Sequence, residues 1–308
     1  MFSFLSLFIT RRCTLRCHYC NLPDNKTYVM SGDEWITVID KLAPHSGFFN
    51  LIGGEPTLHP DLPRIITHLN KIKANYCMVT NSTESQDYYR KLIEEAGLKS
   101  ICVSIDGINS TDKKSTLGRS LAAFIDDELH FSGGRVISSA ISNLKNTVEI
   151  MDFADRYGFK VALTVLQCST DEEQMNSNNP LNTDFSKEET VKTLKFIVAN
   201  YEELPLADPI EYFINSLYFL TFNREWHCAK GLTPAVDCSG ELWSCFDFKG
   251  KISNYMNSGR YNLLRENFDY KVMHEVIKYE CGRCPGCTWN CPYVSEIIAD
   301  GLIESPFI

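Results

Sequence analysis

Three of the thirteen cysteines stand close together near the start of the sequence, in the segment RRCTLRCHYCNLP. They are Cys13, Cys17 and Cys20, separated by three and two residues. Thiolates at this spacing in one loop can converge on a metal centre. A structural zinc ion needs a fourth ligand, and His18 is awkwardly placed between two of the cysteines to complete the same tetrahedron. An iron–sulfur cluster held by only three thiolates leaves one iron open for another ligand.

Most of the other cysteines form a second group near the end of the sequence. They are Cys228, Cys238, Cys245, Cys281, Cys284, Cys287 and Cys291. Their spacing fits a zinc ribbon built from CxxC-like hooks as well as a second iron–sulfur cluster. Cys77, Cys102 and Cys168 stand beside apolar neighbours in expected strands, and we interpret them as buried thiols.

The length and charge of the chain exclude several classes of protein. A chain of 308 residues can bury a full core, and 30 Lys and Arg against 39 Asp and Glu give a net charge of −9. No basic run is present, so we expect no broad nucleic-acid surface. The apolar start, MFSFLSLFIT, precedes its arginines, which is the reverse of a signal peptide, and no apolar stretch is long enough for a membrane span. We therefore expect a cytoplasmic protein that binds no membrane.

Apolar, β-branched runs alternate with amphipathic helical patterns over the first two thirds of the chain. The expected strands cover 4–10, 48–52, 76–80, 100–105, 135–141 and 160–167. One helix begins at Ser31, with Glu34 completing a capping box, and others cover 62–71, 88–96 and 147–157. Such βα units predict parallel strands in a doubly wound sheet or a full or partial barrel, with the chemistry at the carboxyl ends of the strands.

The last third of the chain changes in character. Residues 170–184 are polar and predict a loop or linker, and two helices follow, one from Ser186 and one over 209–222. Beyond them we expect a small cysteine-rich module at about 225–308, after a first domain at 1–224. It would hold a hairpin, with strand 233–237, a turn at Ser239–Gly240 and a return strand ending at Cys245, and a helix at about 262–279.

Four ordered motifs together resemble those of the radical S-adenosylmethionine (SAM) superfamily. They are the three-cysteine loop after the first strand, GGEP at 53–56, TN at 80–81 and VSIDG at 103–107. The resemblance covers about residues 1–200 and implies a partial (β/α)6 barrel. It also implies that Cys13, Cys17 and Cys20 hold a [4Fe–4S] cluster whose open iron binds SAM. Electron transfer would then yield a 5′-deoxyadenosyl radical that abstracts hydrogen from the substrate.

The same resemblance implies a set of residues that contact SAM. They are Tyr19, Gly53, Gly54, Glu55, Pro56, Ser104 and Asp106. The two glycines let the backbone approach a ligand, and Glu55 offers a carboxylate to the methionyl ammonium. Each motif also has a local interpretation, because GGEP and Asp106–Gly107 are turn signals. Asn143 is a weaker candidate of the same kind and is interpreted mainly as a helix cap.

The second cysteine group resembles the auxiliary-cluster domains called SPASM, or their shorter form, twitch. The spacing of Cys228, Gly240 and Cys245 carries this resemblance, whereas the tail CGRCPGCTWNC departs from the full SPASM pattern. It implies at least one auxiliary [4Fe–4S] cluster, with Cys228 and Cys245 as two ligands. Two more would come from a set of four, namely Cys281, Cys284, Cys287 and Cys291. Cys238 is a further ligand, a thiol with a catalytic role, or a buried small residue.

These features predict a radical SAM enzyme of an oxidoreductase or isomerase type. The chain starts almost at its first strand, which favours a small molecule or short peptide as substrate, with the polar loop as a lid or a passive linker. The resemblance also implies a reducing partner such as flavodoxin or ferredoxin. One alternative is a maturase of ribosomal peptides that acts on a partner-delivered precursor. Another is a non-catalytic iron–sulfur or zinc protein for binding or electron transfer.

Overall fold

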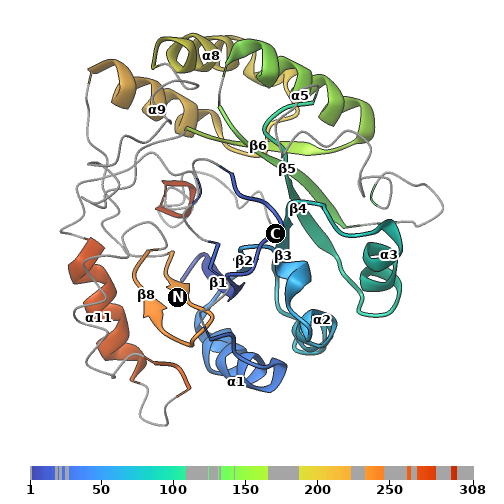
Figure 1. Ribbon diagram of the computed structural model, residues 1–308. Coiled ribbons are helices and arrows are strands. Elements are labelled where there is room, and N and C mark those ends of the chain that lie inside the picture. The colour runs from blue at the N-terminus through green and yellow to red at the C-terminus, as the bar shows by residue number, and fades with distance from the viewer. Residues whose placement is uncertain are drawn as a thin grey trace.

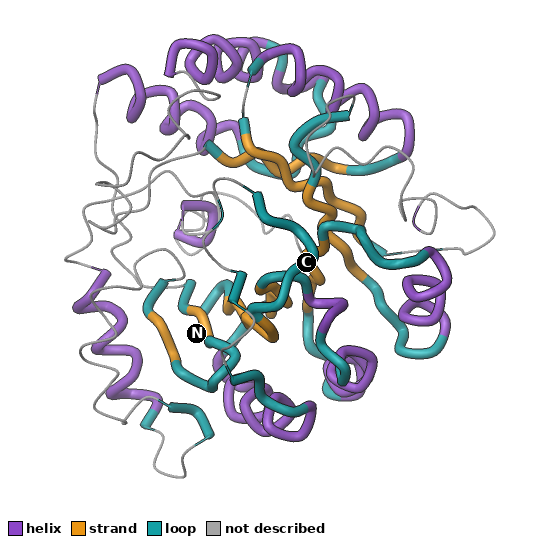
Figure 2. The backbone as a smooth tube through the Cα atoms, viewed as in Figure 1, coloured by secondary structure: helices purple, strands orange, loops and turns teal. Residues whose placement is uncertain are grey.

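A curved sheet of eight strands organises the computed structural model of the chain (Figures 1 and 2). Helices α1 (Gly32–Leu42), α2 (Leu62–Lys71), α3 (Gln86–Glu94) and α5 (Leu144–Tyr157) follow the outer side of this sheet (Figure 1). The structure describes residues 2–17, 20, 23–24, 28–108, 124, 131, 133–141, 143–165, 187–222, 233–245, 262–264, 269–281 and 293–296. The strand order and the parallel pairing of this sheet confirm the predicted α/β architecture of a partial barrel.

Six parallel strands form the main part of the sheet, in the order β6-β5-β4-β3-β2-β1. They are β1 (Leu5–Thr10), β2 (Phe49–Gly53), β3 (Tyr76–Thr80), β4 (Ser100–Ser104), β5 (Gly134–Ala140) and β6 (Lys160–Thr164). Every residue of β1 is buried, as expected for a parallel strand that is covered on both faces. Because all six strands run the same way, their carboxyl ends meet at one edge of the sheet.

Helices and short 3-10 turns connect the strands. They are α1 (Gly32–Leu42), η1 (Ala43–His45), η2 (Pro56–Leu58), α2 (Leu62–Lys71), α3 (Gln86–Glu94), α5 (Leu144–Tyr157), α8 (Lys187–Ala199), η4 (Tyr201–Glu203) and α9 (Ile210–Phe222). The capping box of Ser31 and Glu34 is present. The side chain of Asn143 accepts a hydrogen bond from the backbone of Asn146, so α5 begins three residues before its predicted start. Gly158 ends α5 in the left-handed conformation (φ 69°), as its sequence predicts.

The helices are held on the sheet by apolar stripes. In α1 the buried side chains of Trp35, Val38, Ile39 and Leu42 recur every three or four residues. Each large apolar side chain buried in this way contributes about 1.5–3 kcal/mol to folding. The same core includes residues from all six parallel strands, so one hydrophobic core supports the whole edge where the strands end.

A hairpin from the C-terminal part of the chain extends the same sheet. Its strands, β7 (Ala235–Val236) and β8 (Leu242–Trp243), are antiparallel to each other, and β7 pairs in parallel with β1. The backbone amide of Ser6 donates to the carbonyl of Pro234 at 3.0 Å, which continues this pairing. The predicted hairpin is therefore present, and its strands add to the barrel sheet.

The helix predicted at 262–279 begins later than expected. Residues 262–264 instead pair with the hairpin turn, where Leu263 N donates to Gly240 O at 2.8 Å. Helix α11 (Tyr270–Cys281) begins after Asp269, whose carboxylate accepts hydrogen bonds from the backbone amides of Lys271 and Val272. The predicted helix is thus present, but its predicted start was wrong because Asn262 and Leu263 pair with the hairpin, where Leu263 packs in the core.

Two expectations fall outside the described residues, namely the loop at 170–184 and the domain boundary near 225. The last predicted strand is confirmed as far as Thr164. Within the described part of the chain, no helix has the length and apolar character needed to cross a membrane.

An ion pair ties the hairpin to the end of β1. The guanidinium of Arg11 binds the carboxylate of Asp237, and it also lies 5.4 Å from the centre of the Trp243 ring. The Asp237 side chain is only 3% exposed, whereas that of Arg11 is 24% exposed. The other carboxylate oxygen of Asp237 accepts the backbone N–H of Ser239 at 3.0 Å. This carboxylate therefore stabilises both the hairpin turn and its junction with the sheet.

We expect Asp237→Ala to lower the free energy of unfolding by about 2 kcal/mol, because it leaves Arg11 without its buried partner. Urea unfolding followed by circular dichroism measures this loss. Asp33→Ala is the matched control, since the pair between Asp33 and Arg64 is exposed and its loss should cost at most about 0.5 kcal/mol. Equal losses in the two variants would contradict the role given to Asp237.

Candidate active site

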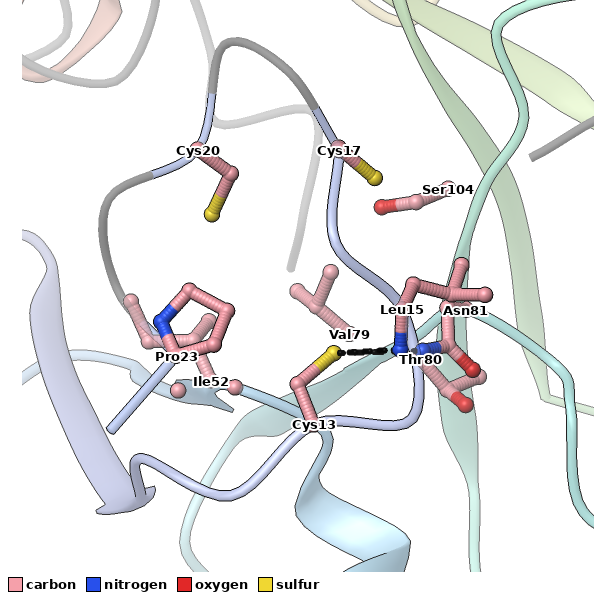
Figure 3. Close-up of a pocket in the computed structure, with 12 residues that line it drawn as sticks. Cys13, Leu15, Cys17, Cys20, Pro23, Ile52, Val79, Thr80, Asn81 and Ser104 are labelled. Carbon is pink, nitrogen blue, oxygen red and sulfur yellow. Dashed lines mark hydrogen bonds between the residues drawn. The ribbon is translucent and has the colours of Figure 1, made fainter. Parts of the chain in front are cut away.

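A cavity of about 180 Å³ lies at the carboxyl ends of β1 to β4 (Figure 3). Its lining consists of Cys13, Leu15, Cys17, Cys20, Pro23, Ile52, Gly53, Gly54, Val79, Thr80, Asn81 and Ser104. The three cysteines of the first group therefore line one cavity, at the edge of the sheet where the sequence places the chemistry. Among the residues that the structure describes, these cysteines are the only Cys, His, Asp or Glu side chains in this lining.

The cysteine loop is fixed by short-range hydrogen bonds. The sulfur of Cys13 accepts the backbone N–H of Leu15 at 3.4 Å, and Cys20 N donates to Cys17 O at 3.0 Å. The guanidinium of Arg16 donates to the backbone carbonyl of Cys13 at 2.7 Å. Burial raises the pKa of the Cys13 thiol, and the backbone N–H of Leu15 acts against this rise. A cation beside this sulfur would favour its thiolate form.

Gly53 and Gly54 line the cavity and also make the site possible sterically. Gly53 has φ 141°, and a Cβ added there would lie 2.2 Å from the carbonyl oxygen of Thr10. A Cβ on Gly54 would lie 2.1 Å from the carbonyl oxygen of Arg12. From the sequence we expect these glycines to let the backbone approach a ligand. In the structure they let the end of β2 approach the backbone that leads into the cysteine loop. Any larger residue would push that loop away.

Glu55 is fully buried behind the cavity and is not part of its lining. Its Oε1 accepts hydrogen bonds from the backbone amide and hydroxyl of Thr57 and from the hydroxyl of Thr80, while Oε2 accepts the backbone N–H of Asn81 at 2.7 Å. Burial raises the pKa of Glu55, and the donated hydrogen bonds oppose this rise. Glu55 thus joins the ends of β2 and β3, and its contact with a SAM ammonium stays a prediction.

The remaining candidates are divided between the cavity and its surroundings. Ser104 lines the cavity. Asp106 accepts a hydrogen bond from the backbone of Ala140 at 3.3 Å, which links the ends of β4 and β5, and it is absent from the lining. Pro56 is buried at the start of η2, and Tyr19 lies outside the described residues.

Two polar residues of the lining were not among the predicted site residues. They are Thr80 and Asn81, the TN motif that ends β3. The sequence does contain a pattern that could identify them as site residues, because the TN motif follows a strand in the same way as GGEP. The sequence alone did not show that Asn81 would reach the cysteine loop, because that contact spans 68 residues of chain.

The second group of cysteines is only partly described. Cys238 is fully buried and its thiol contacts the Asp237 carboxylate at 3.2 Å, and burial raises its pKa to about 12. Of the three roles left open for Cys238, this environment fits that of a buried thiol. Cys245 is partly buried and Cys281 is buried. Cys228, Cys284, Cys287 and Cys291 lie outside the described residues.

The three cysteines outside the clusters match the expectation in part. Cys77 is buried, and burial raises the pKa of its thiol to about 12. Cys102 is only half-buried, although it packs against the small cluster of Phe4, Phe48 and Cys77. Cys168 lies outside the described residues.

The donors around the cavity fit an iron–sulfur cluster better than a single ion. Within the described residues, no three Cys, His, Asp or Glu side chains converge closely enough to bind one metal ion. The three thiols instead surround a cavity large enough to hold a group between them (Figure 3). A [4Fe–4S] cluster takes thiolates on separate irons, and three thiolates leave the fourth iron for another ligand.

The comparisons with known proteins agree with this arrangement. The sequence model of the Radical SAM superfamily matches residues 7–176, which is more than half of the chain. A GTP 3′,8-cyclase from Aquifex aeolicus is 28% identical over 169 residues, which cover 51% of this chain and 45% of that protein. The sporulation killing factor maturation protein SkfB from Bacillus subtilis is 29% identical over 109 residues, covering 34% and 27%. The chain thus spans less than half the length of these curated relatives.

A solved structure resembles the fold over almost the whole chain. SuiB from Streptococcus suis, bound to its precursor peptide SuiA, superposes with a TM-score of 0.65 at 15% identity, covering 99% of this chain and 74% of that one. With the parallel sheet, the cysteine-lined cavity and the family match, the chain belongs to the Radical SAM superfamily. Members of this superfamily are enzymes that use a [4Fe–4S] cluster and S-adenosylmethionine.

We expect Glu55→Gln to destabilise the fold by about 2–4 kcal/mol, because the new amide turns an NH2 group toward hydrogen-bond donors. Thermal unfolding measures this loss. Glu34→Gln is the matched control, because that residue is exposed, caps α1 and otherwise accepts the hydroxyl of exposed Tyr28, so its change should cost about 1 kcal/mol or less. Unchanged stability of Glu55→Gln together with weaker SAM binding would favour direct contact with the ammonium instead.

Proposed function

We propose that this chain is a radical SAM enzyme in which Cys13, Cys17 and Cys20 bind the catalytic [4Fe–4S] cluster. The observation that carries this proposal is the placement of the three thiols around one cavity at the carboxyl ends of the strands. When bound, the cluster and SAM supply a 5′-deoxyadenosyl radical that abstracts hydrogen from the substrate.

In this proposal the protein's own residues bind and orient SAM, and they exclude water from the cavity. Gly53 and Gly54 present backbone to the cavity, and Ser104 offers a hydroxyl from the end of β4. These groups are the candidates for contact with the polar parts of SAM. Leu15, Ile52 and Val79 contribute apolar surface to the same lining, which limits water around the reacting groups. Glu55 and Asp106 hold the strand ends from outside the cavity.

The substrate that we propose is a peptide. The SuiB structure described above contains a precursor peptide, and its resemblance covers 99% of this chain. SkfB, a maturation protein, is also similar to 34% of the chain. The GTP 3′,8-cyclase matches about half of the chain and makes a nucleotide the second candidate. The peptide has the stronger support because the resemblance to SuiB extends over 99% of this chain, whereas the match to the cyclase covers 51%.

An auxiliary [4Fe–4S] cluster is proposed for the C-terminal part of the chain. Cys228 and Cys245 would supply two of its ligands. The others would come from Cys281, Cys284, Cys287 and Cys291. The hairpin that carries Cys245 after β8 extends the sheet of the barrel, so a cluster there would lie in a fixed position relative to β1. Such a cluster could accept an electron or hold the substrate, and a flavodoxin or ferredoxin is the proposed reducing partner.

Anaerobically reconstituted protein should cleave SAM slowly to 5′-deoxyadenosine when dithionite is added, even without substrate. Chromatography measures the product. Cys17→Ala removes one cluster ligand and should abolish this reaction, whereas Cys77→Ala, which changes a thiol away from the cavity, should not. Product from Cys17→Ala at the parent's yield would contradict the assignment.

Adding GTP to the parent protein tests the substrate class, because a clear stimulation of SAM cleavage would favour the nucleotide over the peptide.

The auxiliary cluster has its own test. A variant with Cys13, Cys17 and Cys20 all changed to Ala should retain about four irons per chain after reconstitution, with matching sulfide. Iron, sulfide and zinc analysis gives these counts. About one zinc and no iron would show a zinc site in its place. A count near eight irons would mean that the C-terminal cysteines complete two clusters.

A further inference from the structure

The side chain of Asn81 lies between the cysteine loop and the turn that follows β3 (Figure 3). Its Oδ1 accepts hydrogen bonds from the backbone amide of Thr83 at 3.1 Å and from the Thr83 hydroxyl at 2.7 Å. A backbone N–H can only donate, so the amide atom that faces it must be the oxygen. The NH2 group of Asn81 therefore faces the cysteine loop.

Three side chains form a closed ring of hydrogen bonds at this point. The amide nitrogen of Asn81 lies 3.3 Å from the hydroxyl of Thr14, and that hydroxyl lies 2.8 Å from the hydroxyl of Thr83. Because Thr83 donates its hydroxyl hydrogen to Asn81, Thr14 must donate to Thr83. Asn81 in turn donates to Thr14, so each residue donates to the next, an arrangement in which the bonds strengthen one another.

The ring uses only one of the two hydrogens on the Asn81 amide. The sulfur of Cys13 lies 3.6 Å from the same nitrogen and accepts the second hydrogen. The side chain cannot rotate away without breaking the ring and the bonds from Thr83. Asn81 is buried, at 7% exposure, so water competes little for this N–H. A fixed donor is therefore aimed at the sulfur of one proposed cluster ligand.

We propose that Asn81 is a positioning residue that raises the reduction potential of the cluster through its hydrogen bond to Cys13. The proposal rests on the function proposed above, which makes Cys13 a ligand. Reduction adds one electron from an external reductant, and the added negative charge is shared with the ligating sulfurs. An N–H donor directed at such a sulfur stabilises the reduced form more than the oxidised form.

The experiment is a redox titration of reconstituted protein, with dithionite and mediators, followed by electron paramagnetic resonance (EPR). The signal of the cluster at Cys13 is identified as the one that changes when SAM is added afterwards. Asn81→Ala should shift the midpoint potential of this signal to a more negative value. Asn81→Asp keeps the size and the acceptor for Thr83 but places a carboxylate beside the sulfur, and it should shift the potential further in the same direction.

Two further variants separate tuning from a structural effect. Thr83→Val removes one hydroxyl of the ring and keeps the backbone donor, so it should give a smaller negative shift. Asn75→Ala, at the opposite end of β3, changes an exposed asparagine and should leave the potential unchanged. If Asn81→Ala loses its iron, Asn81→Asp and Thr83→Val decide the matter.

The outcomes distinguish this inference from the proposed function. A parent protein without any SAM-sensitive cluster signal would contradict the proposed function. A parent with that signal, but with Asn81 variants that hold normal iron at the parent's potential, would overturn the role of Asn81 alone. A merely structural role would lower the iron content and leave the potential of the remaining clusters where it was.

Discussion

The buried carboxylate of Glu55 is the constraint on which the geometry of the site depends. A carboxyl group with no exposure to water needs hydrogen-bond partners, and the donors to Glu55 come from Thr57 after β2 and from Thr80 and Asn81 at the end of β3. The backbone amide of Asn81 is one of these donors, so Glu55 fixes the position of the Asn81 backbone at the start of the turn that follows β3. The Asn81 side chain then reaches the cysteine loop. A group that never touches the cavity thus sets the positions of groups that line it.

The cysteine loop is held from its other side by Gly53, the last residue of β2, and by Gly54 and Glu55, which follow it. Backbone amides of Gly54 and Glu55 donate to the carbonyls of Thr10 and Arg12 at 2.8 and 2.7 Å. These contacts are possible only because Gly53 and Gly54 have no side chain at the point of approach. The GGEP segment therefore acts on the cysteines through the backbone of β1. Its glycines and its carboxylate serve one purpose, which is to fix the loop against the ends of two strands.

The fold was largely predictable from the sequence, and the reasons are local. Strands such as 76–80 are continuous apolar runs because parallel strands are buried on both faces, and caps such as Ser31 and Gly158 mark helix ends within a few residues. The three cysteines were predictable because they lie in one loop. The surroundings of Glu55, the reach of Asn81 to Cys13 and the pairing of β7 with β1 were not, because each joins segments far apart in the chain.

The pairing of β7 with β1 also connects the two cysteine regions physically. Arg11 directly follows β1; its side chain binds Asp237 at the end of β7, while its backbone carbonyl accepts the amide of Asp24, beyond the cysteine loop, at 3.0 Å. The same residue therefore anchors the hairpin and closes the base of the loop. Arg11 stands two residues before Cys13, so the junction with the hairpin lies directly beside the cysteine loop. The C-terminal hairpin and the cysteine loop are thus both attached to the end of one buried strand.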